Sequence, residues 1–257
     1  MPSTAKRHFD EDIARAKALL EHARRLPHLR ADKAQLRDDI LRSAWMTSVG
    51  AMDAYYCDAY ADLLARLFRA KNMQPAIRLT AAIEQIDLPV SAIFAETNVR
   101  NWRWRLAARG LIEKDNVLSM KKIKQLFNPF LRNGHKFFEH SMLEDWILVQ
   151  RAPQRLVGIS AAAYRRLSRG DKDSARKDAR KKANAHYDSI CQRRHDCIHN
   201  CDRPKMSLQR ISIGGVEKVN TDILLLVSSC DSLFEVEFNH HLRTIGASGV
   251  TRNACGY

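Results

Sequence analysis

Apolar residues recur at intervals of three and four along most of the chain, which predicts a protein built from α-helices. The first helix is expected at about residues 10 to 26, ending before Pro27, and a much longer one at about residues 31 to 70. Residues 75 to 110 are expected to form two or three short helices, interrupted by Pro89. Further helices are expected at about residues 136 to 150, 155 to 168, 174 to 198 and 221 to 245, and a basic stretch at residues 121 to 127 precedes them.

Two short segments depart from the helical pattern. Residues 208 to 217 alternate between apolar and polar and contain the pair Gly214-Gly215, which predicts a small β-hairpin. The tail at residues 246 to 257 is polar and contains glycine, so we expect it to be disordered. The predicted fold is therefore all-α: a helical bundle in one domain spanning residues 1 to 257, with a helical insertion at about residues 75 to 150 and the hairpin before the last helix.

Two charged residues interrupt the apolar faces of the predicted helices. Arg194 falls on the same face as Tyr187 and Ile198 in the helix of residues 174 to 198, and Asp53 lies in the apolar row of the helix of residues 31 to 70. A buried charge without a partner is unfavourable, so Arg194 must find a partner or reach a cleft. The two residues could form one buried salt bridge between packed helices, or Asp53 could orient a catalytic Arg194, and these roles are compatible.

An arginine followed by two histidines suggests a chemistry. His195 directly follows Arg194, and His199 comes five residues after that arginine. An arginine can hold a phosphate while a histidine, whose ordinary pKa lies near physiological pH, moves the proton of a ribose hydroxyl. Because the chain has 10 histidines, the spacing alone can arise by chance, and the position of Arg194 in an apolar stripe gives it weight. Arg193 is the alternative candidate for the phosphate-binding arginine. We favour Arg194 because it is the one that lies in the apolar stripe.

The composition indicates a polyanionic partner. The 257 residues include 43 basic and 29 acidic ones, a net charge of +14, which favours RNA, although an acidic protein would also suit such a chain. Nine basic residues stand against three aspartates at residues 165 to 182, and this run leads directly to Arg194 and His199. We expect it to guide an RNA backbone to that site, with contacts from Arg176, Lys177, Arg180, Lys181, Lys182 and Arg193. A solvated helix face would have the same composition.

Three other patterns bear on metal binding and nucleic-acid binding. His195, Cys197, His199 and Cys201 alternate and would share a face in a strand, where they could hold zinc, but on a helix they spread around the axis. We therefore expect no metal and no cofactor, and reduced cysteines. Tryptophans and arginines at residues 98 to 106 could stack bases or simply pack, and a helix-turn-helix reader could lie within residues 80 to 130.

The sequence also bears on the compartment. No run of about 18 apolar residues is present, and residues 1 to 10 lack an apolar secretory core. The expected location is the cytoplasm, with no membrane partner.

The residues from Arg194 to His199 resemble the signature of the HEPN superfamily: an arginine, a polar residue, about three variable residues and a histidine. Asp53 resembles the acidic residue that many members carry on their first core helix. The resemblance covers about residues 32 to 70 and 172 to 245, so the core helices would be those near residues 32 to 70, 172 to 200 and 220 to 245.

This resemblance implies an all-α protein that is usually dimeric. Many such proteins are metal-independent endoribonucleases of defence or toxin-type systems, with an antitoxin or another defence protein as partner. His199 would be the base for the ribose 2′-hydroxyl, Arg194 would stabilise the phosphorane, and His195 and Asp53 would complete the site. Members without catalysis serve as RNA-binding or partner-binding modules, and a DNA-binding regulator is a third possibility.

Overall fold

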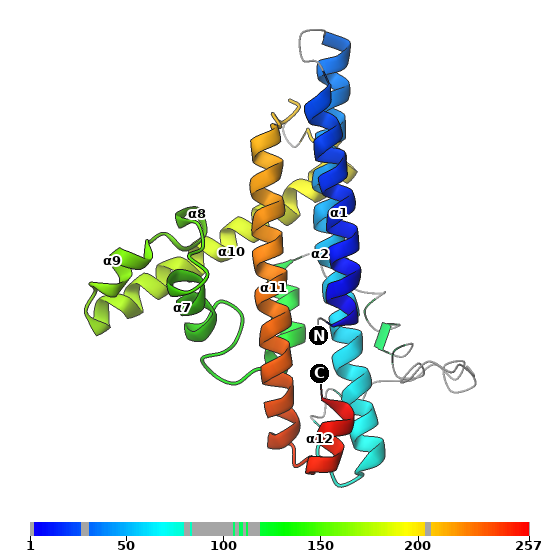
Figure 1. Ribbon diagram of the computed structural model, residues 1–257, viewed down its shortest axis with the longest axis vertical. Coiled ribbons are helices and arrows are strands. Elements are labelled where there is room, and N and C mark those ends of the chain that lie inside the picture. The colour runs from blue at the N-terminus through cyan, green and yellow to red at the C-terminus, as the bar shows by residue number, and fades with distance from the viewer. Residues whose placement is uncertain are drawn as a thin grey trace, which may run out of the picture.

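The computed structural model describes residues 3–26, 31–79, 83, 105, 108–109, 112, 119–203 and 207–256. All regular secondary structure in these residues is helical, which confirms the expected all-α class. The helices expected at residues 10 to 26 and 31 to 70 are present as α1 (Thr4–Arg25) and α2 (Ala31–Met73). Figure 1 shows these two helices running antiparallel along the long axis of the molecule.

A third long helix, α11 (Ile213–Thr244), packs along both α1 and α2 (Figure 1). This helix contacts neighbours on several sides, and its residues Ile223, Leu226, Val227 and Phe234 are all buried. Aromatic rings fill the centre of this bundle. Phe127 stacks on Phe234 with ring centroids 4.6 Å apart, and Tyr56 and Tyr60 of α2 meet the edge of the same Phe127 ring.

The basic helix α10 (Arg169–His199) crosses the bundle and extends beyond it as an arm (Figure 1). Three short helices, α7 (His140–Leu148), α8 (Gln154–Val157) and α9 (Ala161–Arg165), accompany its first half. Its second half reaches α2, where the Trp45 indole N–H donates to the carbonyl of Ile190 over 3.3 Å. The second half of α10 is therefore held against α2 at Ile190.

A fully buried carboxylate joins the arm to α11. Asp222 of α11 accepts from Arg155 of α8 and lies 2.9 Å from the Nε2 atom of His186 on α10. The Tyr187 hydroxyl also donates to the Asp222 carbonyl over 2.8 Å. Because three elements meet at one residue, the direction of α10 is fixed near its middle.

The basic stretch at residues 121 to 127 lies in helix α6 (Met120–Phe127), which continues into the short 3₁₀ helix η1 (Asn128–Phe130). Ser119 starts α6 by accepting from the backbone N–H of Lys122. Most of residues 75 to 110, the part of the insertion in which two or three short helices were expected, lies outside the described residues. The same is true of the Trp/Arg stretch except Arg105, which pairs with Asp62. The same holds for most of the region in which a helix-turn-helix reader was considered.

The expected β-hairpin at residues 208 to 217 is wrong. Residues 208 to 212 form no strand, and Ile213 already begins α11. The side chain of Ser212 accepts from the backbone N–H of Gly215 over 3.1 Å and so caps the helix. The glycine pair therefore lies in the first turn of a helix, where a capping serine overrides its preference for turns.

The expected disorder of the C-terminal tail is also corrected. Residues Gly249–Cys255 form α12, which begins at the capping residue Ser248 and packs on α2. Thr251 and Cys255 are buried, and Gln74 accepts from the backbone N–H of Ser248 and donates to the carbonyl of Gly246. A short amphipathic turn that finds a docking surface is thus ordered despite its polar composition.

The capping role of Ser212 can be tested by substitution. Ser212→Ala removes the acceptor for the Gly215 N–H, so we expect the free energy of unfolding to fall by about 1 kcal/mol, whereas Ser212→Asp retains an acceptor and should remain near wild type. Urea unfolding followed by circular dichroism measures the difference. Equal stability of all three proteins would contradict the helix start assigned here.

Candidate active site

The last turns of α10 form the wall of a pocket of about 340 Å³. Three of the four predicted catalytic residues line this pocket, namely Arg194, His195 and His199. Its remaining lining residues are Ser119, Asp188, Cys191 and Gln192. The arginine and both histidines therefore open into one space.

The two histidines form a pair. His195 and His199 are four residues apart on α10, so they project from the same side, and their ring centroids are 4.3 Å apart with the planes inclined by 42°. Both side chains are exposed to solvent. A phosphodiester entering the pocket can meet both imidazoles at once, which is the arrangement that paired proton transfers need.

Arg194 is partly buried at the edge of the pocket, on the side of α2. Asp53 lies near it: burial raises the pKa of the Asp53 carboxyl above its ordinary value, and the positive charge of Arg194 offsets part of that rise. No direct ion pair joins the two among the described residues, and the buried Asp53 Oδ1 atom accepts no hydrogen bond there. The predicted proximity is thus present, but not as a closed salt bridge.

Arg193, the alternative acting arginine, points to the other side of α10. Its guanidinium donates to Asp202 over 3.1 Å and to the carbonyl of Arg210 over 3.0 Å, and it lies over the Trp45 ring at 4.8 Å. Its side chain is 16% exposed. Neighbouring arginines therefore have different surroundings, and Arg194 is the one that reaches the pocket.

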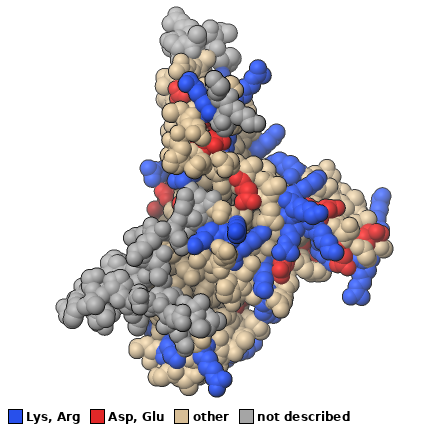
Figure 2. All heavy atoms as spheres, turned by 180° about the vertical axis from the view of Figure 1, so that it is seen from behind, with Lys and Arg blue, Asp and Glu red and all other residues tan. Residues whose placement is uncertain are grey.

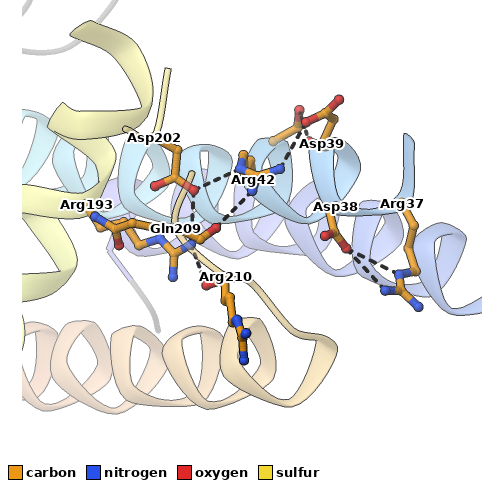
Figure 3. A network of polar contacts seen from close by, with 9 residues as sticks. Arg37, Asp38, Asp39, Arg42, Arg193, Asp202, Gln209 and Arg210 are labelled. Carbon is orange, nitrogen blue, oxygen red and sulfur yellow. Dashed lines mark hydrogen bonds and ion pairs between the residues drawn. The ribbon is translucent and has the colours of Figure 1, made fainter. Parts of the chain in front are cut away.

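Asp202 anchors the end of α10 to α2 (Figure 3). This residue is fully buried and accepts from Arg42 of α2 over 2.8 Å as well as from Arg193. Arg42 also donates to the carbonyl of Gln209 over 3.0 Å. The chain leaves the helix through Cys201 and Asp202, both at positive φ, and the Asp202 N–H bonds back to the Asp196 carbonyl over 2.9 Å. A buried ionic cluster therefore holds to α2 the end of the helix that carries the histidine pair.

The four residues considered for zinc do not face one site. His195 and His199 line the pocket, whereas Cys197 lies near Asp202, Arg193 and Arg42. Burial, followed by the negative charge of Asp202, raises the pKa of the Cys197 thiol to about 11. No group of three metal-binding side chains occurs in the part of the chain that the structure describes.

One expectation about the stripe is corrected. Ile198 was placed on the buried apolar face, but its side chain is 48% exposed, one residue before His199. The helix ends at His199, and among the described residues nothing buries this side of its last turn. An exposed isoleucine thus borders the histidine pair.

Sequence reasoning missed Asp188 and Ser119. Asp188 lies seven residues before His195, which places it on the same side of α10, and its carboxylate accepts from the backbone N–H of Met120 over 3.2 Å. The two-turn spacing could have revealed Asp188. No signal in the sequence indicated Ser119, because it reaches the pocket only through the packing of α6 on α10.

The predicted RNA-contacting residues divide between two sides of the arm. Arg176, Lys177 and Arg180 line one pocket between α7 and α10, whereas Lys181 and Lys182 line another beside α8. Arg176 is largely occupied, since it pairs with Glu144 and Asp173 and is 13% exposed. Figure 2 shows Lys and Arg side chains gathered over this part of the molecule, on the face opposite to that of Figure 1.

Comparison of the chain with protein-family models, with curated proteins and with solved structures gives no match. Among the described residues no helix combines the length and apolar character needed to span a bilayer. An assignment of function therefore depends on the site itself.

The buried cluster yields a prediction about stability. Asp202→Ala leaves Arg42 and Arg193 buried without their carboxylate, so we expect the free energy of unfolding to fall by about 3–5 kcal/mol. Asp39→Ala is the matched control, because Asp39 also pairs with Arg42 but has a side chain that is 57% exposed, and its loss should cost less than about 1 kcal/mol. Equal losses in urea unfolding would contradict the anchoring role.

Substitution of Asp53 is expected to stabilise the protein, in contrast to substitution of Asp202. A carboxyl whose pKa is raised in the folded state destabilises the fold once it ionises, so Asp53→Asn should increase the free energy of unfolding at pH 7. The gain should shrink as the pH falls through the raised pKa and vanish below the ordinary value of 3.8. A loss of stability at pH 7, measured by urea unfolding, would instead indicate a closed salt bridge with Arg194.

Proposed function

We propose that the protein is a metal-independent endoribonuclease of the HEPN type. The observation that carries the proposal is the convergence of Arg194 with the exposed His195–His199 pair in one pocket at the end of α10. The motif resemblance supports it, as does Asp53, which lies on α2 and interacts electrostatically with Arg194. The net charge of +14 suits an RNA substrate.

In the proposed reaction His199 accepts the proton of a ribose 2′-hydroxyl. The 2′-oxygen then forms a bond to the adjacent phosphorus, and the bond from phosphorus to the 5′-oxygen breaks. His195, protonated beforehand, gives its proton to that leaving oxygen. The products are a 2′,3′-cyclic phosphate and a 5′-hydroxyl, and no metal or cofactor takes part.

Arg194 neutralises the charge that develops on the non-bridging oxygens of the phosphorane. Asp53 is a positioning residue: its carboxylate attracts the guanidinium from the side of α2 without closing an ion pair. Arg194 therefore keeps its hydrogen-bond donors available for a phosphate. Arg193 takes no part in this chemistry because its guanidinium is bound to Asp202.

The proposal includes a homodimer. The family resemblance implies it, and the exposed Ile198, which precedes His199 in the chain, places the contact with a second chain at this end of α10. Two Arg194/His199 pairs would then share one cleft. By the same resemblance we propose a role in defence or in a toxin-type system, with an antitoxin or another defence protein as further partner.

The central test is His199→Ala. The purified variant and the wild type are incubated with total RNA in the presence of a chelator, and fragment ends are mapped. We expect wild type to generate cyclic phosphate ends and the variant to cleave about 10²-fold more slowly or worse, because the base is lost. Circular dichroism should show an unchanged fold, since His199 is exposed.

His22→Ala serves as the control, because His22 is an exposed histidine on α1, far along the chain from the pocket. It should cleave like wild type, and its activity together with the loss in His199→Ala would exclude a contaminating ribonuclease. Cleavage by His199→Ala at the wild-type rate would overturn the catalytic assignment. RNA binding without cleavage by any of the three proteins would favour a non-catalytic binding module of the same fold.

A further inference from the structure

The histidine pair stands at one end of a polar row on α10. Residues along this row follow one another at helical spacings of three, four or seven, so they project from one side of the helix. The row consists of Lys177, Arg180, Asn184, Asp188, His195 and His199. Its two ends each open into a pocket, the candidate active site at one end and a second pocket at the other.

The second pocket has a volume of about 390 Å³ and lies between α7 and α10. Arg176, Lys177 and Arg180 contribute three cations to its lining, against the carboxylates of Glu139 and Asp173. Arg176 is already neutralised by its own ion pairs. Lys177 is exposed, with no ion pair among the described residues, and Arg180 is 49% exposed with its nearest carboxylate 3.9 Å away. Two cations are thus available to a ligand.

Lys124 of α6 connects the two pockets. Its ammonium group donates to Asn184 at the middle of the row and lies 5.1 Å from the centre of the Phe138 ring. Burial lowers the pKa of Lys124, the charge of Arg180 lowers it further, and Asp188 and Glu139 act in the opposite direction. Lys124 therefore lies within electrostatic reach of residues from both pockets.

We propose that the pocket containing Lys177 and Arg180 is a second phosphate-binding subsite, which anchors the same RNA strand that is cleaved at the histidine pair. This inference rests on the proposed function. The helical rise places Lys177 about 27 Å from His195 along the axis. At about 3.4 Å per stacked nucleotide this distance corresponds to about eight nucleotides. RNA long enough to reach both sites should therefore bind more tightly than shorter RNA.

The other basic pocket provides the contrast. It has a volume of about 470 Å³, and Lys181 and Lys182 line it beside α8. The aliphatic part of Lys182 lies over Gly158, where a β-carbon would stand only about 3.0 Å from it, so this side chain is used in packing. Lys182 projects from α10 on a different side from Lys177, five residues earlier. A strand that follows the row to His195 passes Lys177 and Arg180 instead.

The experiment uses full-length His199→Ala protein as background, so that RNA stays intact. Fluorescence anisotropy measures binding of single-stranded RNA of about four and about twelve nucleotides at several salt concentrations. The longer RNA should bind more tightly. Adding Lys177→Ala and Arg180→Ala should weaken its binding by about tenfold or more and lower the slope of log K against log salt by about 0.7 for each lost phosphate contact, leaving the shorter RNA unaffected.

Lys172→Ala with Lys182→Ala is the matched control, since both lysines project from α10 on other sides than the row and the substitutions remove the same number of charges from the same helix. It should leave the length dependence intact. Equal weakening by both pairs would overturn the subsite and indicate general attraction to a basic arm, as would equal affinity for the two RNA lengths. If wild type cleaves no RNA yet Lys177 and Arg180 still set the affinity for the longer strand, the subsite stands and the proposed function fails.

Discussion

The arrangement of the site depends on one buried carboxylate. Asp202 has no exposed surface, and its charge is tolerable only because Arg42 and Arg193 donate to it from two different helices. The same cluster binds the backbone carbonyls of Gln209 and Arg210, so the chain is drawn back across the end of α10. Because Arg193 is committed to this contact, the register of the helix is fixed, and Arg194 must leave the helix on the side of the pocket.

Helical geometry then separates residues that are adjacent in sequence. One step along an α-helix turns the side chain by about 100°, so Arg193 and Arg194 face different surroundings, and Cys197 is separated from the histidines on either side of it. The same rule brings His195 and His199 together at 4.3 Å. Within one continuous helix, Arg193 therefore contacts buried Asp202, whereas Arg194, His195 and His199 line the pocket.

Local patterns predicted the helices well because their apolar periodicity coincides with burial in the bundle. The same patterns failed where a single hydrogen bond or a docking surface decided the outcome. Gly214-Gly215 has a turn preference, yet the Ser212 cap makes it helical, and the polar tail is ordered because Gln74 and α2 accommodate it. Arg194 and the histidines were found from position in the sequence. Asp202 was not found, because its importance arises from Arg42, which lies 160 residues away.

Asp53 shows how stability and function can oppose each other at such a site. Burial raises the pKa of its carboxyl, and its Oδ1 atom accepts no hydrogen bond among the described residues, so the ionised form is unfavourable in the folded protein. An apolar residue or an asparagine at position 53 would remove that cost. The charge is explained if its role is to attract Arg194 without binding its donors, because a closed salt bridge would occupy the groups that a phosphate needs.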